Sequence, residues 1–470
     1  MKPRLSLLCL ALSLSACSAV GPDFRRPDGA GLPAQYLEPG GGQSVSAVWQ
    51  QLLADPVLAD LQQAALRDNP DFAVALLRVQ QARADQAVQD AGSGPSVGLT
   101  AQNSQDRISR NSELFANAPP VGNLRTRFSN SQIGFDASWE IDLFGHQRRL
   151  SEAALARTEA LQERAQDARL SLLAEVARQY LALRLAQQRG RLAQAQLDDL
   201  DSEVAITRIA VEHGELARSD LQRLLAQRDN FAAGLPNLAQ AERQALAALS
   251  TLCAMAGAEL QRRLAETWPL PEVPPPPATG LPADLLRQRP DVRAAERDWA
   301  AASADVGVAT ALQYPQVSLV GHGGWQSVSQ GALLDPASRD WSFGPSLSLP
   351  LFNSDRLAGQ VRSREAALKA AEVSYRKAVQ AALADVEVAL SRMAQSEHRR
   401  GQLLRSQAEQ AELLRLTELQ LQAGDSSRLN VLEARRSLNS QQDQVLQAQG
   451  ESLTALVAIC KSLGGGWAAP

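Results

Sequence analysis

An internal duplication is the feature that most constrains how this chain can fold. Asn69-Pro70-Asp71 recurs about 220 residues later as Arg289-Pro290-Asp291, and self-similarity at a long fixed spacing marks repeated structural units. Two further pairs of stretches follow in the same order, Gly94-Pro95 with Tyr314-Pro315 and His213-Gly214-Glu215 with Ala423-Gly424-Asp425. Because the two halves are collinear, we expect one series of helices and strands to occur twice.

The duplication divides the chain into two repeats joined by a linker. We expect an N-terminal extension and the first repeat in residues 17–267, the second repeat in residues 283–467, and a short tail in residues 468–470. The linker in residues 268–282 contains four consecutive prolines, Pro274 to Pro277. Such a run favours a stiff, extended segment of polyproline type.

Each repeat contains two stretches in which apolar residues alternate with small or polar ones. In the first repeat the apolar positions are Val97, Leu99, Ala101, Ile133, Phe135, Ala137 and Trp139. In the second they are Val317, Leu319, Gly321, Trp325, Trp341, Phe343, Leu347 and Leu349. A period of two predicts strands with one apolar face, and lengths of about ten residues with aromatic ends are typical of lipid-facing strands around a wet lumen. A four-stranded sheet of a soluble protein is the alternative.

A very long helical stretch follows each pair of strands. Residues 147–212 contain no proline and are rich in Ala, Leu, Arg, Gln and Glu, and about 66 residues in one helix would extend roughly 100 Å. After a turn at Gly214, we expect the chain to return as one helix over residues 218–255. The second repeat is expected to run over 356–423, turn at 424–427 and return to 463. The fold class is therefore mainly α with a small β part, built from a duplicated unit of strands and a long antiparallel helix hairpin.

The N-terminus has the features of a bacterial lipoprotein signal. Lys2 and Arg4 precede an apolar run that ends at Leu14-Ser15-Ala16-Cys17, and this run is too short to span a membrane as a helix. We interpret residues 1–16 as a cleaved signal peptide and Cys17 as the lipid attachment site. Ser18 follows this cysteine, which in the lipoprotein pattern implies sorting to the outer membrane. An ordinary signal peptide with a chance cysteine is the alternative.

The sequence also limits how the chain can cross a membrane. No stretch after Cys17 is apolar over the length that a membrane-spanning helix needs, so a crossing would have to be made by strands in a closed barrel. Four strands cannot close a barrel alone, and an open edge in lipid would leave backbone groups unpaired. Several copies would therefore have to share one barrel, and a dimer, a trimer and a tetramer are all compatible with the pattern.

Two cysteines remain after the signal peptide and Cys17 are set aside. Cys253 and Cys460 would lie in a compartment that permits disulfides. They either form one bridge or serve as two separate, buried apolar residues, and their spacing along the chain does not decide between these possibilities.

The composition gives no indication of catalysis, metal binding or nucleic-acid binding. The chain has 47 Lys and Arg against 51 Asp and Glu, without a basic cluster. The four histidines are scattered, at His146, His213, His322 and His398, and none belongs to a zinc-binding helix pattern. Gly464-Gly465-Gly466 lacks the lysine of a phosphate-binding loop and is better explained as a helix end. We expect a protein that is not an enzyme, with no metal and no cofactor beyond a covalent lipid on Cys17.

Several motifs together resemble the TolC family of outer-membrane efflux proteins, and within it the lipoprotein branch related to OprM and NodT. They are Val20-Gly21-Pro22-Asp23-Phe24 after Cys17, Leu281-Pro282-Ala283-Asp284-Leu285-Leu286, Arg289-Pro290-Asp291-Val292-Arg293-Ala294-Ala295-Glu296, and Lys461-Ser462-Leu463-Gly464-Gly465-Gly466-Trp467. The resemblance extends essentially from end to end. Taken together, these motifs are far more specific than any one of them.

The resemblance implies a homotrimer with a 12-stranded transmembrane barrel on a long α-helical periplasmic barrel. It implies an exit channel for drugs or other small toxic compounds, anchored in the outer membrane and working with a periplasmic adaptor and an inner-membrane pump of the resistance-nodulation-division type. The helix-tip turns at Gly214, Glu215, Gly424 and Asp425 would lie at the closed periplasmic end. Asp425 and Arg428 are the candidates for a charged aperture. Alternatively, Asp425 simply caps the helix that follows it.

Two other classes of protein fit parts of this pattern. A periplasmic adaptor is also lipid-anchored and has a long helical hairpin, but adaptors carry one hairpin and a lipoyl-like β domain, without this duplication. A lipoprotein scaffold or enzyme with a coiled-coil stalk is the second alternative.

Overall fold

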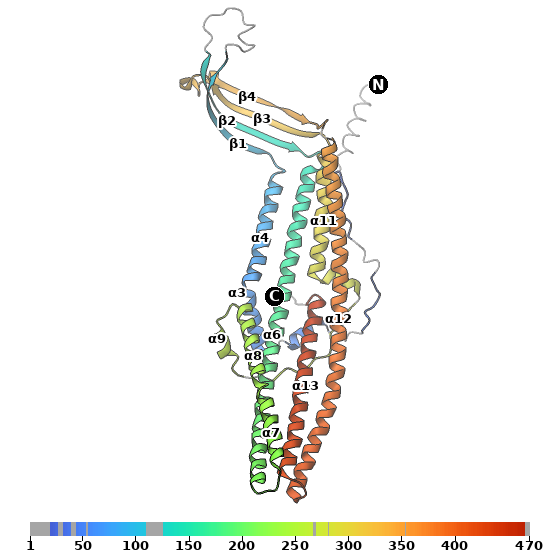
Figure 1. Ribbon diagram of the computed structural model, residues 1–470. Helices are drawn as coiled ribbons and strands as arrows, with labels where there is room; N and C mark the ends of the chain where they lie inside the picture. Colours follow the sequence, from blue (N-terminus) through green and yellow to red (C-terminus); the bar gives the residue numbers. More distant parts are fainter. Residues whose placement is uncertain are drawn as a thin grey trace, which may run out of the picture. The chain divides into compact units, whose positions relative to one another are not determined.

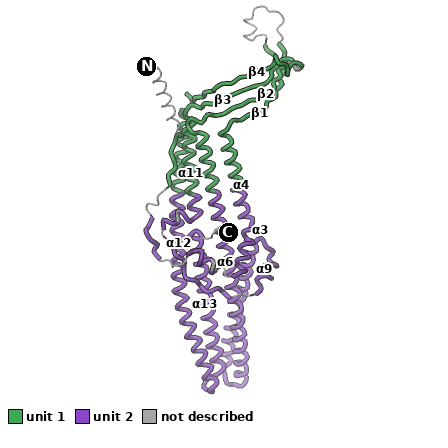
Figure 2. Tube along the Cα trace, turned by 180° about the vertical axis from the view of Figure 1, so that it is seen from behind, with its two compact units in different colours: residues 1–26, 79–160, 295–374 green, residues 27–78, 161–294, 375–470 purple. Residues whose placement is uncertain are grey.

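The computed structural model describes residues 19–26, 32–38, 44–52, 55–109, 126–266, 269–280, 282–352 and 354–465. The chain divides into two compact units, each formed by three separate segments (Figure 2). Unit 1 comprises Met1–Arg26, Val79–Ala160 and Ala295–Ser374, and unit 2 comprises Pro27–Arg78, Leu161–Ala294 and Tyr375–Pro470. Each unit therefore takes segments from both predicted repeats. The repeat boundaries themselves stay a prediction.

One series of elements occurs twice along the chain (Figure 1). The first series is α4 (Pro70–Ala91), β1 (Ser96–Arg107), β2 (Arg127–Ile141), α6 (His146–Glu212), α7 (Arg218–Ala232) and α8 (Leu235–Leu252). The second is α11 (Pro290–Ala311), β3 (Gln316–Ser327), β4 (Arg339–Ser348), α12 (Ser354–Ala423) and α13 (Arg428–Ser462). The shorter elements are α2 (Val45–Leu52), α3 (Pro56–Asp68), α9 (Gly257–Arg263), η1 (Pro282–Asp284), α10 (Leu285–Gln288), η2 (Gln330–Ala332) and η3 (Pro336–Ser338).

The residues that revealed the duplication have matching contacts in the two repeats. The side chain of Asn69 donates to the carbonyl of Leu252 at the end of α8, over 3.0 Å. Arg289 takes its place in the second repeat and donates to the carbonyl of Ser462 at the end of α13, over 3.2 Å. Each residue thus holds the end of the returning helix of its own repeat, where backbone carbonyls lack helical partners.

The long helices are close to their predicted bounds. α6 begins one residue before the predicted stretch and ends at the predicted Glu212, and α12 ends at the predicted Ala423. Both are free of proline in their interiors, so their ladders of backbone hydrogen bonds need not break. Within the described part of the chain, no helix is both long enough and apolar enough to cross a membrane.

The prediction of one unbroken helix over residues 218–255 is wrong. The chain forms two helices there, α7 and α8, separated at Ala233 and Gly234. Pro236 stands in the first turn of α8 and has no N–H to donate to the carbonyl of Ala232, so the helical ladder is interrupted at this point. α13, the corresponding helix of the second repeat, contains no proline and is continuous.

The core of unit 2 lies between its helices. Leu183 of α6, Leu249 of α8, and Leu453 and Leu456 of α13 are fully buried, and burial stabilises such side chains by about 1.5–3 kcal/mol each. Gly450 of α13 lies against α6, because a Cβ at this position would approach the side chain of Leu185 to 2.7 Å. The helices of unit 2 are thus held together by an apolar seam with close backbone approach.

Candidate functional site: a two-faced sheet and two exposed helix turns

The four strands form one antiparallel sheet in unit 1, in the order β1-β2-β3-β4. The register places Leu99 opposite Phe135, Phe135 opposite Gly323, and Gly323 opposite Trp341. Side chains alternate along a strand, so the odd-numbered apolar residues of all four strands share one face. Trp341 is 81% exposed and Phe343 is 71% exposed, so the described residues leave this apolar face uncovered.

The opposite face carries a polar network that reaches across the whole sheet. His322 of β3 lies between two carboxylates, with Nδ1 2.7 Å from Asp136 Oδ1 and Nε2 3.3 Å from Asp340 Oδ2. Thr100 of β1 donates to the other oxygen of Asp136 over 2.6 Å. These contacts join all four strands, and they join the first repeat to the second.

The rest of this polar face is hydrophilic or small. Its even-numbered positions are occupied by Gly, Ser, Asn, Gln and acidic residues, and Phe128 and Val320 are the exceptions. The predicted alternation is therefore confirmed on each of the four strands. A sheet with one apolar face and one polar face, both without a covering layer in the described chain, is suited to separating lipid from water.

The two outer strands leave the sheet open. β1 pairs with β2 and β4 pairs with β3, and neither has a second neighbouring strand among the described residues. An outer strand presents a row of backbone N–H and C=O groups that can pair with another chain. The sheet thus has two edges at which further strands can join it.

Two tight turns end the long helices in unit 2, and Figure 1 shows both turns at the same end of that unit. After α6, Gly214 has φ +75° and Glu215 N–H donates to the Ala210 carbonyl over 2.8 Å. After α12, Gly424 has φ +85° and Asp425 N–H donates to the Gln420 carbonyl over 2.8 Å. Both are Schellman-type ends, in which glycine adopts the left-handed conformation that other residues avoid.

The turn after α12 presents both aperture candidates to solvent. Asp425 and Arg428 are exposed, and neither side chain forms an ion pair within the described chain. Asp425 does not cap the following helix, so that alternative is wrong. The capping residue is Ser427, whose Oγ accepts a hydrogen bond from Asn430 N–H over 3.2 Å. The charges of Asp425 and Arg428 are thus available to groups outside this chain, and a role in an aperture stays a prediction.

Comparison with known proteins decides the family. The family described as "Outer membrane efflux protein" matches residues 61–258 and 281–465. The chain belongs to this family. It is 30% identical to Nodulation protein T of Rhizobium leguminosarum bv. viciae, over 99% of this chain and 94% of that protein. It is 30% identical to the toluene efflux pump outer membrane protein TtgI of Pseudomonas putida, over 97% of each chain.

Solved structures of the outer membrane efflux family have the same fold. The outer-membrane channel OprN superimposes with a TM-score of 0.83 at 32% identity, over 95% of this chain and 99% of that chain. The predicted resemblance and fold class are thereby confirmed, as is the interpretation as an efflux channel of the outer membrane. Members of the family are channel proteins rather than enzymes. The adaptor-like and scaffold alternatives are set aside by this match.

In this member of the efflux family, residues 20–24, which follow Cys17, are held against the rest of unit 1 by hydrogen bonds and ring packing. Val20 N–H donates to the Phe144 carbonyl over 3.0 Å. Arg149, whose side chain is 5% exposed, donates to the Val20 carbonyl over 3.2 Å and to Asp23 over 2.7 Å. The ring of Phe24 packs edge-on against Trp299, with centroids 5.3 Å apart. No local pattern in the sequence points to Arg149, because its partners are distant in the chain. Cys17 itself and the predicted signal peptide, residues 1–16, lie outside the described residues.

Both described cysteines of this efflux protein are free thiols, so the possible Cys253–Cys460 disulfide is absent. Burial raises the pKa of Cys253 to about 11 and that of Cys460 to about 12. The thiol of Cys253 lies 3.4 Å from the carbonyl of Leu61, to which it donates. Each cysteine therefore behaves as a small buried side chain, the second possibility that the sequence left open.

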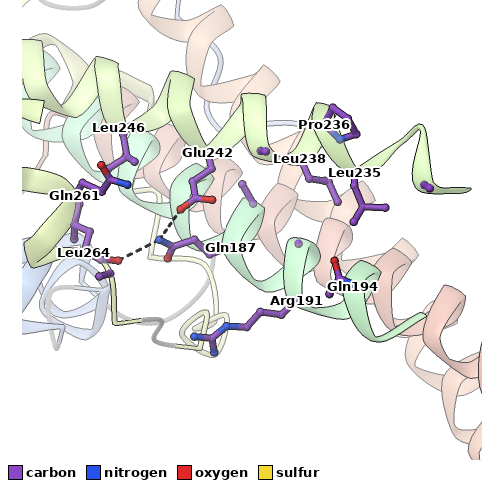
Figure 3. A pocket seen from close by; sticks show the side chains of 15 residues that line it. Gln187, Arg191, Gln194, Leu235, Pro236, Leu238, Glu242, Leu246, Gln261 and Leu264 are labelled. Carbon is purple, nitrogen blue, oxygen red and sulfur yellow. Dashed lines mark hydrogen bonds between the residues drawn. The ribbon is translucent and has the colours of Figure 1, made fainter. Parts of the chain in front are cut away.

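A hollow of about 660 Å³ lies between α6, α8 and α9 in unit 2 (Figure 3). Gln187 of α6 lines the hollow, and its side-chain amide donates to Glu242 over 3.2 Å and to the Leu264 carbonyl over 3.1 Å. Its lining has no histidine, cysteine or serine, and its one carboxylate, Glu242, accepts the hydrogen bond from Gln187. Across the described residues, no group of His, Cys, Asp and Glu is arranged to hold a metal ion.

Proposed function

We propose that three copies of this chain form one outer-membrane exit channel, with a 12-stranded barrel closed by pairing β1 of each copy with β4 of the next. The observation that carries this proposal is the sheet, which sorts apolar and polar residues onto opposite faces and has two open edges. In lipid, unpaired edge groups are costly, so each open edge requires a partner strand. The apolar face would contact lipid, and the polar face would line the lumen.

The proposed lipid anchor on Cys17 is supported by the segment directly after it. Residues 19–26 are held by hydrogen bonds to Arg149 and by packing of Phe24. A lipid attached three residues before Val20 would therefore be tied to the same unit that contains the sheet. The lipid anchor and the membrane-inserted sheet would then both belong to unit 1.

The proposed periplasmic end is the pair of turns after α6 and α12. Three copies would bring together three Asp425 and three Arg428 side chains, which have no partner in the described part of their own chain. A ring of alternating charges narrows a pore and can select solutes. Glu215 of the first turn is also exposed and would add to this charged end.

The proposed partners are a periplasmic adaptor and an inner-membrane pump of the resistance-nodulation-division type. The related TtgI is described as the outer membrane protein of a toluene efflux pump. A passive conduit has no energy source of its own, so transport requires a pump. The exported compounds would be drugs or other small toxic molecules delivered by that pump.

The oligomeric state in lipid tests the proposal. The full chain, purified with its native processing and embedded in lipid nanodiscs, should release a complex of three chains in native mass spectrometry. Reconstituted in planar bilayers, the same sample should give ion-conducting channels. A protein that stayed monomeric in lipid, or that formed complexes of another size, would overturn the proposed barrel.

A further inference from the structure

The charged side chains of the strands are sorted by sign between the two faces of the sheet. The polar face carries Asp106, Asp136, Glu140 and Asp340, with no Arg or Lys at any of its strand positions. The apolar face carries Arg107, Arg127 and Arg339, with no Asp or Glu. Asp106 and Arg107 are neighbours in β1 yet point to opposite faces, as do Arg339 and Asp340 in β4. The acidic residues therefore do not neutralise the arginines.

The three arginines lie at the strand ends that are farthest from α4 and α6, which adjoin the other end of the sheet in unit 1 (Figure 1). Arg107 ends β1 and Arg127 begins β2, and the register places them directly opposite each other. Both are exposed, and neither forms an ion pair within the described chain. Like charges directly opposite in a sheet are destabilising, so a nearby anion would stabilise this pair.

Arg339 lies at the edge of the apolar surface. It begins β4 and is opposite Trp325 of β3, and Trp325 is opposite Ile133 of β2. Beyond Ile133, the same face of β2 changes to Ser131 and Ser129 before it reaches Arg127. On this face, apolar residues give way to tryptophan and then to arginine. The same order suits the passage from the hydrocarbon core of a membrane to its headgroup region.

We propose that Arg107, Arg127 and Arg339 bind the phosphate groups of anionic glycolipids in the outer leaflet of the membrane. The proposal rests on the function proposed above, because the apolar face must contact lipid and the helices must lie in the periplasm. The guanidinium group offers paired N–H donors that match phosphate oxygens, and it loses less hydration than an ammonium group. Solvated arginines alone would not explain why every charge of this face is positive.

Binding of lipopolysaccharide by the full-length protein in detergent tests the proposal. Fluorescently labelled lipopolysaccharide is titrated against the wild type and against a variant with Arg107→Gln, Arg127→Gln and Arg339→Gln. Each arginine near an anionic lipid surface contributes about a fivefold gain in affinity, so the triple variant should bind roughly a hundredfold more weakly. Lipopolysaccharide stripped of its phosphates should bind both proteins weakly and equally.

The matched control changes the neighbouring charges on the other face. A variant with Asp106→Asn and Asp340→Asn alters the same strands but should bind lipopolysaccharide as the wild type does. Equal binding by the wild type and the arginine variant, or undiminished binding of the stripped lipid, would overturn the inference. Native mass spectrometry of the same samples separates this outcome from failure of the proposed channel. If the wild type forms a stable trimer but binds the lipid equally with and without its phosphates, only the proposed arginine contacts are contradicted. If the wild type forms no trimer, the proposed channel itself is contradicted.

Discussion

Glu203 of α6 shows how a single buried charge depends on its partner. Its side chain is 7% exposed and lies 2.5 Å from Arg436 of α13, so this ion pair joins α6 to α13 within unit 2. Desolvation raises the pKa of Glu203 above its ordinary value, and the positive charge of Arg436 acts in the opposite direction. Because the pKa is raised in the folded state, this group favours folding when protonated and loses that contribution as the pH rises through the folded pKa.

Replacing Arg436 by methionine should make stability depend on pH. The variant leaves the Glu203 carboxylate buried and unpaired, so its pKa should rise further. At pH 7.5 we expect a loss of about 2–3 kcal/mol, less than a fully buried pair would lose, because Arg436 is itself 20% exposed. At pH 5 the loss should be smaller, because more of Glu203 is protonated. Denaturant titrations followed by helical circular dichroism measure both values.

Two controls accompany the Arg436 variant. Arg435→Met removes a neighbouring arginine whose partners Glu418 and Asp199 lie 3.5 and 3.7 Å away at a more exposed site, so it should cost less than about 1 kcal/mol at either pH. Adding Glu203→Gln to Arg436→Met should abolish the difference between pH 5 and pH 7.5. A difference that persisted in this double variant would mean that another group is responsible.

The proposed aperture role of Asp425 and Arg428 can be tested by the conductance of the channel. Replacing both by alanine should raise the single-channel conductance in planar bilayers, because a charged constriction would be removed. Ser427→Ala is the matched control. It removes the cap of α13, at a cost of about 1 kcal/mol, but leaves both charges in place, so its conductance should remain that of the wild type. Unchanged conductance in the double variant would eliminate these residues from the aperture.

At the scale of single residues, the sequence was informative only where chemistry is local. The sequence offers Asp425 as a candidate cap of α13, but Ser427 stands at the helix boundary and takes that role. The buried state of the two cysteines follows from packing between distant segments, which spacing does not reveal. Arg149 has no local signal for the same reason, since its partner Asp23 lies far away in the chain.

The helices and strands were predictable because their signals are periodic. Long proline-free stretches gave α6 and α12 almost to the residue, and alternation gave the four strands, although β2 begins earlier than its apolar residues indicated. The break between α7 and α8 was missed because a single proline, Pro236, outweighs the favourable helix propensity of the residues around it. The order of strands in the sheet required the contacts between the repeats, and no local pattern contains that information.

The turn between α12 and α13 should favour glycine at position 424. Gly424→Ala forces alanine into a left-handed conformation with φ +85° and should destabilise the hairpin by about 1–2 kcal/mol. Gly401→Ala, inside α12, meets no atom within 4 Å and should stabilise the helix by up to about 1 kcal/mol. Denaturant midpoints of the two variants should therefore move in opposite directions. A shift in the same direction would mean that the turn does not require this backbone conformation.

At the scale of the whole molecule, the duplication explains why one chain contributes a sheet with an even number of strands and two open edges. Each repeat supplies two strands, and β2 and β3 pair across the junction between the repeats. Polar contacts from Asp136 to His322 reinforce that junction. Among the described residues, each chain therefore supplies four paired strands and leaves the outer edges of β1 and β4 without a neighbouring strand.

The proposed lipid anchor on Cys17 leads to a separate prediction for the whole molecule. Cys17→Ser should abolish incorporation of radiolabelled palmitate, because the acylated side chain would be lost. The Arg149 contacts to residues 20–23 do not involve Cys17 and should hold that segment in place without the lipid. Persistent labelling of the serine variant would refute the assignment of Cys17.

Disulfide cross-linking between β1 and β4 tests the central claim most directly. Thr100→Cys is combined in turn with Ser342→Cys, Gly344→Cys or Ser346→Cys, which place all the new thiols on the polar face, while native Cys253 and Cys460 are buried. For at least one combination, oxidation in the membrane should produce linked pairs and a covalently closed set of three chains, with nothing larger on a denaturing gel. Only single chains in every combination, or a ladder that continues beyond three, would contradict a barrel shared by three copies.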